Sequence, residues 1–471
     1  MQRFAKYEWA LIVLFVLTLP LINPWVRGDG VGYYAFARSM LIEHKLDFTK
    51  DWLNANPSFR MGRMDAEGKI LPRQYTTTGH LDNHFSVGPA ILWSPFLIAA
   101  HAGVLLCDRL GANIAANGYS RPYVVAMALG TAFYGFVALF ISFSLARRYV
   151  PEGWAFLATL GIWFGSSLPV YMYFNPSWSH AHSAFAVALF LWYWIRTRGE
   201  RSLAQWTILG ALGGLMLDVY YMNVVLLLLP LTDSLARYWS AFRGIPQEPT
   251  SRLFIKNVVF SATLVAAFAP TLIAKKIIYG GWLNFGYGEH WYWNSPAFLK
   301  VCFSSEHGLF SWTPILALAI VGLLFLRQRD PVIALSLFVT FWIYVYELGC
   351  YQDWHGISSY GSRFCVGLTC VFVVGLAGFL DWLGGAMQER RAALFAWGGT
   401  AILVLWNLGL IFQWGMHLIP ERGPIEWRSA AYNQVAVVPG EAASAAKAYL
   451  VGRKNLMEHI EQTDVRELRH Q

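Results

Sequence analysis

Residues 366–380 read VGLTCVFVVGLAGFL and contain no charged side chain. Similar apolar stretches occur at residues 260–273 and 314–326. Each reaches roughly the 20 residues needed to cross a bilayer once its apolar flanks are added. Trp and Tyr are concentrated at the ends of these stretches, where amphipathic rings favour the membrane interface. The sequence therefore predicts an all-α protein that crosses the membrane several times.

The composition supports this interpretation. The 471 residues are 56% hydrophobic and 14% charged, whereas a soluble domain has about 25% charged residues. The net charge of +8 comes from short basic clusters, such as Arg147-Arg148 and residues 196–201, rather than from one continuous basic face. We therefore expect membrane lipids and no nucleic acid among the partners.

The cysteines show neither a CxxC motif nor metal-ligand spacing. They are Cys107, Cys302, Cys350, Cys365 and Cys370. Cys302 and Cys350 fall in separate predicted outer loops, so a disulfide between them is one alternative, although free thiols are favoured.

The distribution of basic residues predicts the topology. Arg3 and Lys6 precede the first apolar stretch, and no small-residue cleavage site follows it. We interpret residues 7–24 as an uncleaved first helix with a cytoplasmic N-terminus, followed by a long outer loop at residues 25–86. The same rule places further helices near residues 122–146, 153–173, 181–195, 252–279, 309–326, 331–349, 364–384 and 392–418.

This arrangement gives about eleven spans, with further outer loops at residues 280–308 and 350–363. Residues 1–419 form one transmembrane domain, and residues 420–471 form a small polar tail on the outer side. An amphipathic helix is expected in the tail near residues 440–461. Function is expected on the outer face, where the long loops lie.

Two segments do not fit a simple alternation of spans. The ends of residues 87–107 must both lie outside, which favours an interfacial or re-entrant element. Residues 203–231 are too long for one span and have cytoplasmic basic flanks, so they are expected to form two short helices. Asp218 would lie at their tip, either as a functional group or hydrogen-bonded to Tyr220 or Tyr221.

The first outer loop contains a carboxylate between two glycines, in Gly28-Asp29-Gly30. At the membrane boundary such a carboxylate can accept a proton from a sugar hydroxyl. Tyr33 and Tyr34 follow it and offer aromatic contacts. The alternative is that Asp29 only caps the helix that follows.

The late outer loop ends with Gly361-Ser362-Arg363. Arg363 begins a membrane helix from the outside, against the usual placement of basic residues, which indicates a specific anionic partner. Its guanidinium suits a phosphate, and neighbouring backbone groups can add donors. The alternative is a lipid head group.

Other outer-loop residues mix aromatic, acidic and imidazole side chains, which suits sugar rings but also interfacial anchoring. These candidates for donor or acceptor binding are Glu289, His290, Glu306, His307, Trp354 and His355. His180 and His182 are weak candidates for metal ligation, and plain hydrogen bonding is the simpler interpretation.

Four motifs, taken in order, resemble those of a bacterial branch of the GT-C glycosyltransferases. They are residues 28–34, residues 84–89 together with Pro95, residues 307–314 and residues 361–363. The superfamily includes protein O-mannosyltransferases, oligosaccharyltransferases and the aminoarabinose transferase of lipid A. The resemblance extends to about residue 420 and implies a GT-C fold.

The resemblance also implies a mechanism. Asp29 would be the catalytic base, and Arg363, Ser362 and Gly361 would bind the phosphate of a polyprenyl-phosphate sugar. An acceptor hydroxyl would attack with inversion at the periplasmic face of the bacterial inner membrane. Tyr33, Tyr34 and His84 would join the donor- and acceptor-binding residues. The acceptor, whether glycan, lipid or protein, is not identified.

The resemblance implies no required cofactor. Metal-dependent relatives carry acidic residues at the outer turn where this chain has residues 175–182, so a divalent metal is possible but not favoured.

Two other functions remain open. A lipid-linked glycan ligase or polymerase would need additional arginines for a pyrophosphate, and the first loop contains Arg60, Arg63 and Arg73. A lipid or glycolipid flippase is less favoured, because transporters usually show internal repeats and midplane charges, whereas the candidate groups of this chain lie outside.

Overall fold

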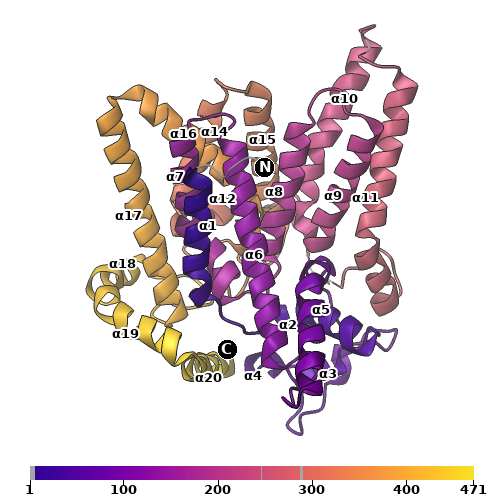
Figure 1. The fold of residues 1–471 in the computed structure, drawn as a ribbon, viewed down its shortest axis with the longest axis vertical. Coiled ribbons are helices and arrows are strands. Elements are labelled where there is room, and N and C mark those ends of the chain that lie inside the picture. The colour runs from indigo at the N-terminus through magenta and orange to yellow at the C-terminus, as the bar shows by residue number, and fades with distance from the viewer. Residues whose placement is uncertain (1–5, 246, 287–289, 471) are drawn as a thin grey trace.

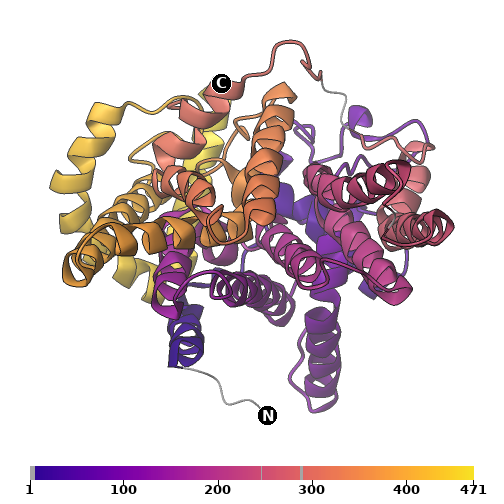
Figure 2. The same cartoon turned by 90° about the horizontal axis from the view of Figure 1, so that it is seen from above.

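The computed structural model describes residues 6–245, 247–286 and 290–470. Within them the secondary structure is helical, apart from isolated β-bridges. Figure 1 shows a bundle of long helices with the first-loop helices and the C-terminal helices at the same end. Seen from above, α17 and the tail lie at one side of the bundle and α9 to α11 at the other (Figure 2).

Six helical segments are long and apolar enough to span a membrane. They are α5 (Gly88–Arg109), α6 (Arg121–Ala146), α11 (Thr250–Tyr279), α15 (Pro331–Cys350), Arg363–Ala386 and α17 (Glu389–Gly415). Shorter helices precede or follow them along the chain: α1 (Lys6–Thr18), α7 (Glu152–Gly165), α8 (His180–Arg196), α9 (Leu203–Val219), α10 (Leu228–Phe242) and α14 (Ile315–Leu326). The chain is a multi-pass membrane protein, and the number of eleven spans stays a prediction.

Most of the helices predicted from apolar stretches are present, with two interruptions. The predicted helix at residues 309–326 is divided into α13 (Leu309–Trp312) and α14, because Pro314 cannot continue a helix. The predicted helix at residues 153–173 ends at Gly165, and a π-helical turn follows at Val170–Phe174.

Glycines allow the helices of the bundle to approach closely. A Cβ added to Gly322 of α14 would lie 1.9 Å from the carbonyl oxygen of Gly375 in α16 (Thr369–Ala386). Likewise, a Cβ on Gly214 of α9 would lie 2.3 Å from the carbonyl oxygen of Leu264 in α11. Close backbone contact of this kind is the usual way to pack helices in lipid, where burial of apolar surface gives little driving force.

The segment at residues 87–107 is a single continuous helix, α5. It therefore does not fold back on itself, so the re-entrant alternative is wrong. A Cβ added to Gly88 would lie 2.4 Å from the backbone of Asp218, so the helix begins directly against the end of α9.

The segment at residues 203–231 breaks at Tyr220, as predicted, but its second helix is longer than expected: a 3₁₀ turn at Tyr221–Leu227 leads into α10, which continues to Phe242. Among the described residues Asp218 makes no hydrogen bond to Tyr220, one of the two tyrosines named as the alternative to a functional role. Asp218 Oδ1 accepts a hydrogen bond from the backbone N–H of Thr271 at 3.0 Å. Thr271 follows Pro270, whose ring disturbs the hydrogen bonding of α11. Asp218 therefore serves as the acceptor for a backbone N–H of α11 beside its internal proline.

The C-terminal tail differs from its prediction as one amphipathic helix in a polar appendage. It forms α18 (Trp427–Ala436), α19 (Val438–Val451) and α20 (Arg453–His470). α20 packs on the loop at residues 25–86, where Glu461 accepts a hydrogen bond from the backbone N–H of Ser58 at 2.6 Å. The tail is thus an integral part of the same end of the bundle as this loop.

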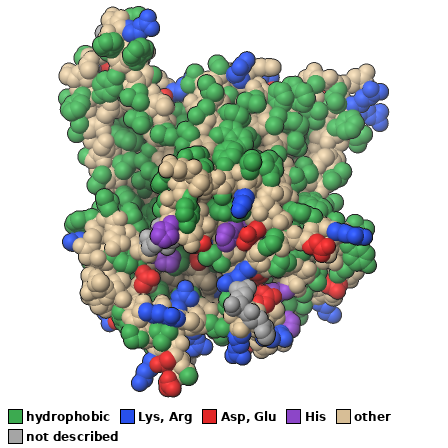
Figure 3. All heavy atoms as spheres, turned by 180° about the vertical axis from the view of Figure 1, so that it is seen from behind, with side chains coloured by type: hydrophobic (Ala, Val, Ile, Leu, Met, Phe, Trp, Pro, Cys, Tyr) green, Lys and Arg blue, Asp and Glu red, His purple; other side chains and the backbone are tan. Residues whose placement is uncertain are grey.

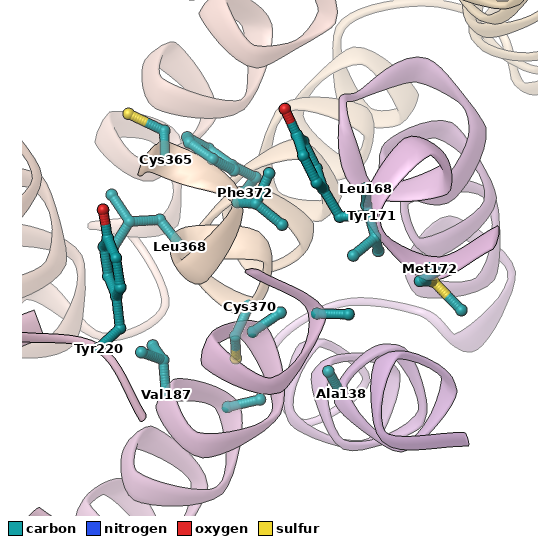
Figure 4. Close-up of a cluster of buried hydrophobic side chains, with 14 of the residues drawn as sticks. Ala138, Leu168, Tyr171, Met172, Val187, Tyr220, Cys365, Leu368, Cys370 and Phe372 are labelled. Atoms are coloured by element: carbon teal, nitrogen blue, oxygen red, sulfur yellow. The ribbon is translucent and has the colours of Figure 1, made fainter. Parts of the chain in front are cut away.

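The core beneath the outer loops joins α6, α8, α16 and the turn before α8. Figure 4 shows Tyr171, Phe372 and Val187 among its buried side chains. Cys365 and Cys370 belong to the same core, and all five cysteines are free thiols, as favoured from the sequence.

Candidate active site

A cavity of about 750 Å³ lies where the loops predicted to be outer, the break after α9 and the tail meet. Acidic and histidine side chains gather mostly below a broad hydrophobic band on the face shown in Figure 3. The ionisable side chains that line the cavity are Arg27, Asp29, Arg63, His84, His180, Glu347, Asp353, Arg363, Glu421, Arg422, Asp464 and Glu467, and tyrosines that line it include Tyr33, Tyr220, Tyr221 and Tyr351.

Asp29 and Arg363 meet in this cavity, as the joint roles implied by the resemblance require. Arg363 Nη1 donates to Asp29 Oδ2 at 2.5 Å, and the two residues are 334 positions apart in the chain. Asp29 is the first residue of α2 (Asp29–Arg38), and the residue at the N-cap is Gly28. The alternative of Asp29 as the helix cap is therefore wrong, since the carboxylate points to Arg363.

Arg363 is held between aromatic rings. Its guanidinium carbon lies 4.6 Å from the centroid of Trp178 and 5.1 Å from that of Phe364. Only 11% of the side chain is exposed, and its Nε makes no hydrogen bond to the described residues. A buried guanidinium with an unused donor beside a carboxylate is suited to an oxyanion.

Glycine at position 30 lets the Asp29 helix approach the turn before α8. A Cβ at Gly30 would lie 1.9 Å from Ser177 Oγ. In the same region Ser179 Oγ donates to Tyr33 Oη at 2.9 Å. Burial raises the pKa of Tyr33, so its phenol stays neutral and can bind a sugar hydroxyl.

Two more first-loop side chains line the cavity. Arg63 packs on the Phe59 ring and donates to the Phe59 carbonyl oxygen at 2.9 Å. His84, with its ring 4.0 Å from Asp82, also lines it. By contrast, Arg60 and Arg73 do not line this cavity.

Other predicted site residues lie outside the lining. Gly361 and Ser362 are buried beneath Arg363, and the Ser362 hydroxyl faces Cys365 Sγ at 3.4 Å. Gly361 has φ +54°, a left-handed conformation that turns the chain inward before Arg363. Tyr34 points away from the cavity and donates to the Gly118 carbonyl oxygen at 2.7 Å.

The predicted residues around His307 form a second layer that ties two loops together. His307 Nδ1 lies 2.7 Å from the His355 carbonyl oxygen, and the His355 ring lies 3.3 Å from Glu306. Trp354 packs edge-on against His355. Burial lowers the pKa of His307 to about 4. These residues support the late loop without lining the cavity.

The remaining predicted site residues lie in different parts of the structure. His290 is exposed and lies outside the cavity lining, and Glu289 falls outside the described residues. His180 lines the cavity between the Tyr171 and Tyr220 rings, whereas His182 is buried beside Trp93. The two histidines do not share one site, and neither belongs to the group of side chains that lie close enough together to hold a metal ion among the described residues.

Several lining residues were not predicted. Glu347 brings a carboxylate from inside α15, and Glu421 and Asp464 bring two from the tail. Asp464 binds Arg27 at 2.5 Å across 437 residues of sequence. Glu347 could have been predicted from the sequence, because a lone carboxylate in an apolar span indicates function. No sequence pattern predicts the two tail residues, since their position in the cavity depends on tertiary packing alone.

Comparisons with known proteins show similarity in structure only. No protein-family model and no curated protein matches the sequence. The chain is similar to the crystal structure of ArnT from Cupriavidus metallidurans bound to undecaprenyl phosphate, with a TM-score of 0.50 and 13% identity over 95% of this chain and 77% of that one. The apo form of that protein gives a TM-score of 0.47 and 14% identity over the same shares.

The archaeal oligosaccharyltransferase AglB from Archaeoglobus fulgidus, in complex with an inhibitory peptide and a dolichol-phosphate, gives a TM-score of 0.48 and 14% identity. The match covers 87% of this chain and 55% of that one. At such identities the likeness concerns the fold.

Proposed function

We propose that this chain, which has the GT-C fold, is an inverting glycosyltransferase. It transfers a sugar from a polyprenyl-phosphate donor to an acceptor hydroxyl at the periplasmic face of the bacterial inner membrane. The observation that carries the proposal is the 2.5 Å pair of Asp29 and Arg363 inside the outer cavity.

The pair supplies both groups that such a transfer needs. Arg363 is the cation that receives the donor phosphate, and it has an unused Nε donor for this purpose. A phosphate entering the cavity competes with Asp29 for the guanidinium. Binding of the donor therefore releases the Asp29 carboxylate, which becomes free to accept a proton.

In the proposed step, Asp29 accepts the proton of the acceptor hydroxyl as its oxygen attacks the anomeric carbon. The new carbon–oxygen bond forms on the face opposite the leaving group, so the configuration inverts. The bond between the anomeric carbon and the phosphate oxygen breaks, and its electron pair leaves with the phosphate. Arg363 stabilises the charge that develops there. Because the phosphate leaves as a stable anion, the step requires no dedicated general acid.

The lipid class of the donor is supported by the fold neighbour. ArnT from Cupriavidus metallidurans was crystallised with undecaprenyl phosphate. The cavity is also lined by aromatic side chains from several elements, including Tyr33, Tyr220 and Trp291. Such rings suit the apolar faces of a sugar, while their hydroxyl and indole groups can bind its edges.

A pyrophosphate-linked donor is the second candidate, and one observation favours it. Arg63 lines the same cavity as Arg363, so a second guanidinium is present for a second phosphate. The reaction would then belong to a glycan ligase or polymerase. The two candidates differ in the donor and share Asp29 as the base.

The test is sugar transfer by the purified full-length protein in nanodiscs. Undecaprenyl-phosphate sugars and undecaprenyl-diphosphate sugars are offered with an extract of envelope lipids as acceptor, and release of the free lipid phosphate is followed. We expect turnover by the wild type and by the control Glu67→Gln, which alters an exposed carboxylate of the first loop. Turnover is expected to be lost in Asp29→Asn.

The product configuration is then determined by NMR, and inversion is expected. If no donor is consumed while labelled lipid crosses the bilayer of proteoliposomes, the proposed transferase function is wrong and the lipid flippase function is supported.

A further inference from the structure

Three side chains that can bind a metal converge at the rim of the cavity, apart from the Asp29–Arg363 pair. His417 follows the end of α17, Glu421 lies in the next turn, and Asp464 belongs to α20. One ligand atom from each lies within 4.8 Å of the other two. The group therefore joins the last long helix of the bundle to the C-terminal helix.

The distances suit a small divalent cation. His417 Nε2 lies 3.3 Å from Asp464 Oδ1. Two ligands at about 2.0–2.2 Å from a tetrahedral zinc ion are about 3.4 Å apart, so these atoms already have the required separation. Glu421 needs only a side-chain adjustment to complete three ligands, because its carboxylate is within 4.8 Å of both.

The atoms that face one another are buried and lack hydrogen bonds. Asp464 is 6% exposed, and its Oδ1 makes no hydrogen bond among the described residues. Both ring nitrogens of His417 are likewise buried without a hydrogen bond there. Buried polar atoms are normally satisfied, so this cluster calls for a ligand.

The surroundings of His417 have the form of a metal site. Its other ring nitrogen, Nδ1, lies 3.4 Å from Glu467 Oε1, one turn along α20 from Asp464. A histidine that ligates a metal through one nitrogen usually presents the other to a carboxylate, which fixes the ring. Glu467 occupies that position.

The charges around the cluster also favour a cation. Glu421 and Asp464 are buried near Glu461 and Glu467, and the cations that act on Glu421 are Arg27 and Arg422. Four carboxylates thus face two guanidiniums. A divalent cation offsets the excess negative charge, whose burial is otherwise costly.

We propose that His417, Glu421 and Asp464 bind a divalent transition-metal cation, with zinc favoured by the one imidazole and two carboxylate ligands. The cation fixes α20 to the end of α17. Asp464 Oδ2 accepts a hydrogen bond from Arg27, which lies two residues before Asp29. The site therefore also stabilises the position of the loop that carries the proposed base. The role is structural, and the inference does not depend on the proposed transferase activity.

The test measures zinc binding by the full-length protein, purified in detergent without a polyhistidine tag and stripped with a chelator. Titration calorimetry with zinc chloride and metal analysis after dialysis give affinity and stoichiometry. We expect one zinc ion per chain in the wild type. We expect at least a tenfold weaker affinity in His417→Gln and Glu421→Gln. The matched control is His459→Gln, which removes an exposed imidazole from the same α20 and should bind like the wild type.

Thermal unfolding supplies a second readout that does not depend on the folding of a ligand variant. Zinc should raise the Tm of the wild type and of His459→Gln, and magnesium should not. Absence of stoichiometric zinc binding by the folded wild type would overturn the proposal. So would equal zinc affinity in the wild type and in a folded His417→Gln. Loss of transferase activity alone bears on the proposed function and leaves the metal site untouched.

Discussion

Asp29 Oδ2 and Arg363 Nη1 lie 2.5 Å apart, although 334 residues separate them in the chain. This pair fixes how the two proposed roles are coupled. In the structure the Asp29 carboxylate is occupied by the Arg363 guanidinium. When a phosphate takes its place on Arg363, the carboxylate is released. In the proposed mechanism, donor binding and release of the base are therefore one event.

The first prediction concerns Asp29→Asn. Removing the general base should lower kcat by about 100- to 10,000-fold. The donor should bind at least as tightly as to the wild type, because the substitution removes the anion that competes with phosphate for Arg363. Steady-state kinetics and binding of undecaprenyl phosphate separate the two effects. Weaker donor binding with kcat unchanged would contradict the assignment.

The second prediction concerns Arg363. Arg363→Lys keeps the charge but loses the planar fork and its stacking between Trp178 and Phe364. We expect donor affinity to fall at least tenfold in Arg363→Lys and further in Arg363→Ala. Arg60→Ala, which removes an exposed arginine of the first loop, is the matched control and should bind donor normally. Binding unaffected by Arg363→Ala would remove this residue from the donor site.

The third prediction distinguishes the two donor classes through Arg63. If the donor carries one phosphate, Arg63→Ala should change its affinity by less than about threefold, whereas a diphosphate donor should lose about tenfold or more. These ratios correspond to less than about 0.7 and to about 1.4 kcal/mol or more. Competition by undecaprenyl phosphate and undecaprenyl diphosphate against a bound labelled donor measures both. Equal losses for both lipids would mean that Arg63 acts on the shared part of the donor.

Much of the bundle and the meeting of Asp29 with Arg363 could be predicted from the sequence. Apolar stretches of this length predict helices, because in lipid the backbone N–H and C=O groups can form hydrogen bonds only within the protein. Basic clusters fix which loops share a side. Asp29 and Arg363 each begin a helix from the predicted outer side, so topology places them on one side of the membrane, and the resemblance implies that they act at one site.

The rest of the site depended on contacts that no local pattern records. The tail reaches the cavity through the Arg27–Asp464 pair, which joins residues 437 apart. Gly361 and Ser362 turn inward because Gly361 has a left-handed backbone, so Arg363 lines the cavity without them. Asp218 accepts a hydrogen bond from the backbone N–H of Thr271, which follows a proline in α11. Each of these required the packed structure.

The fourth prediction concerns the close approach at Gly30. In Gly30→Ala the new Cβ would lie 1.9 Å from Ser177 Oγ, so either α2 or the turn before α8 must shift. Overpacking of this kind costs about 1–3 kcal/mol, and a lower Tm is expected. Gly30→Ala/Ser177→Gly should recover part of the loss, because it removes the clashing side chain. Gly398→Ala, with no heavy atom within 4 Å of its added Cβ, is the control. A Tm of Gly30→Ala equal to that of the control would show that the approach is not tight.

The fifth prediction concerns acid sensitivity at His307. Burial holds its folded pKa at about 4, below the ordinary value of 6.5. Between these values the unfolded chain binds a proton that the folded chain does not, so stability falls as the pH drops from 6.5 towards 4 and is unaffected above about 7. The loss approaches about 3 kcal/mol at the acidic end.

His307→Asn is the informative variant. Asparagine tolerates the left-handed backbone at this position, where φ is +57°, and its amide can replace the donor to the His355 carbonyl oxygen. We expect its Tm to fall less than that of the wild type between pH 7 and pH 5, while the exposed control His459→Gln follows the wild type. Parallel Tm curves for the wild type and His307→Asn would assign the acid sensitivity to other groups. A smaller fall in His307→Asn assigns it to the buried imidazole that joins the two loops behind Arg363.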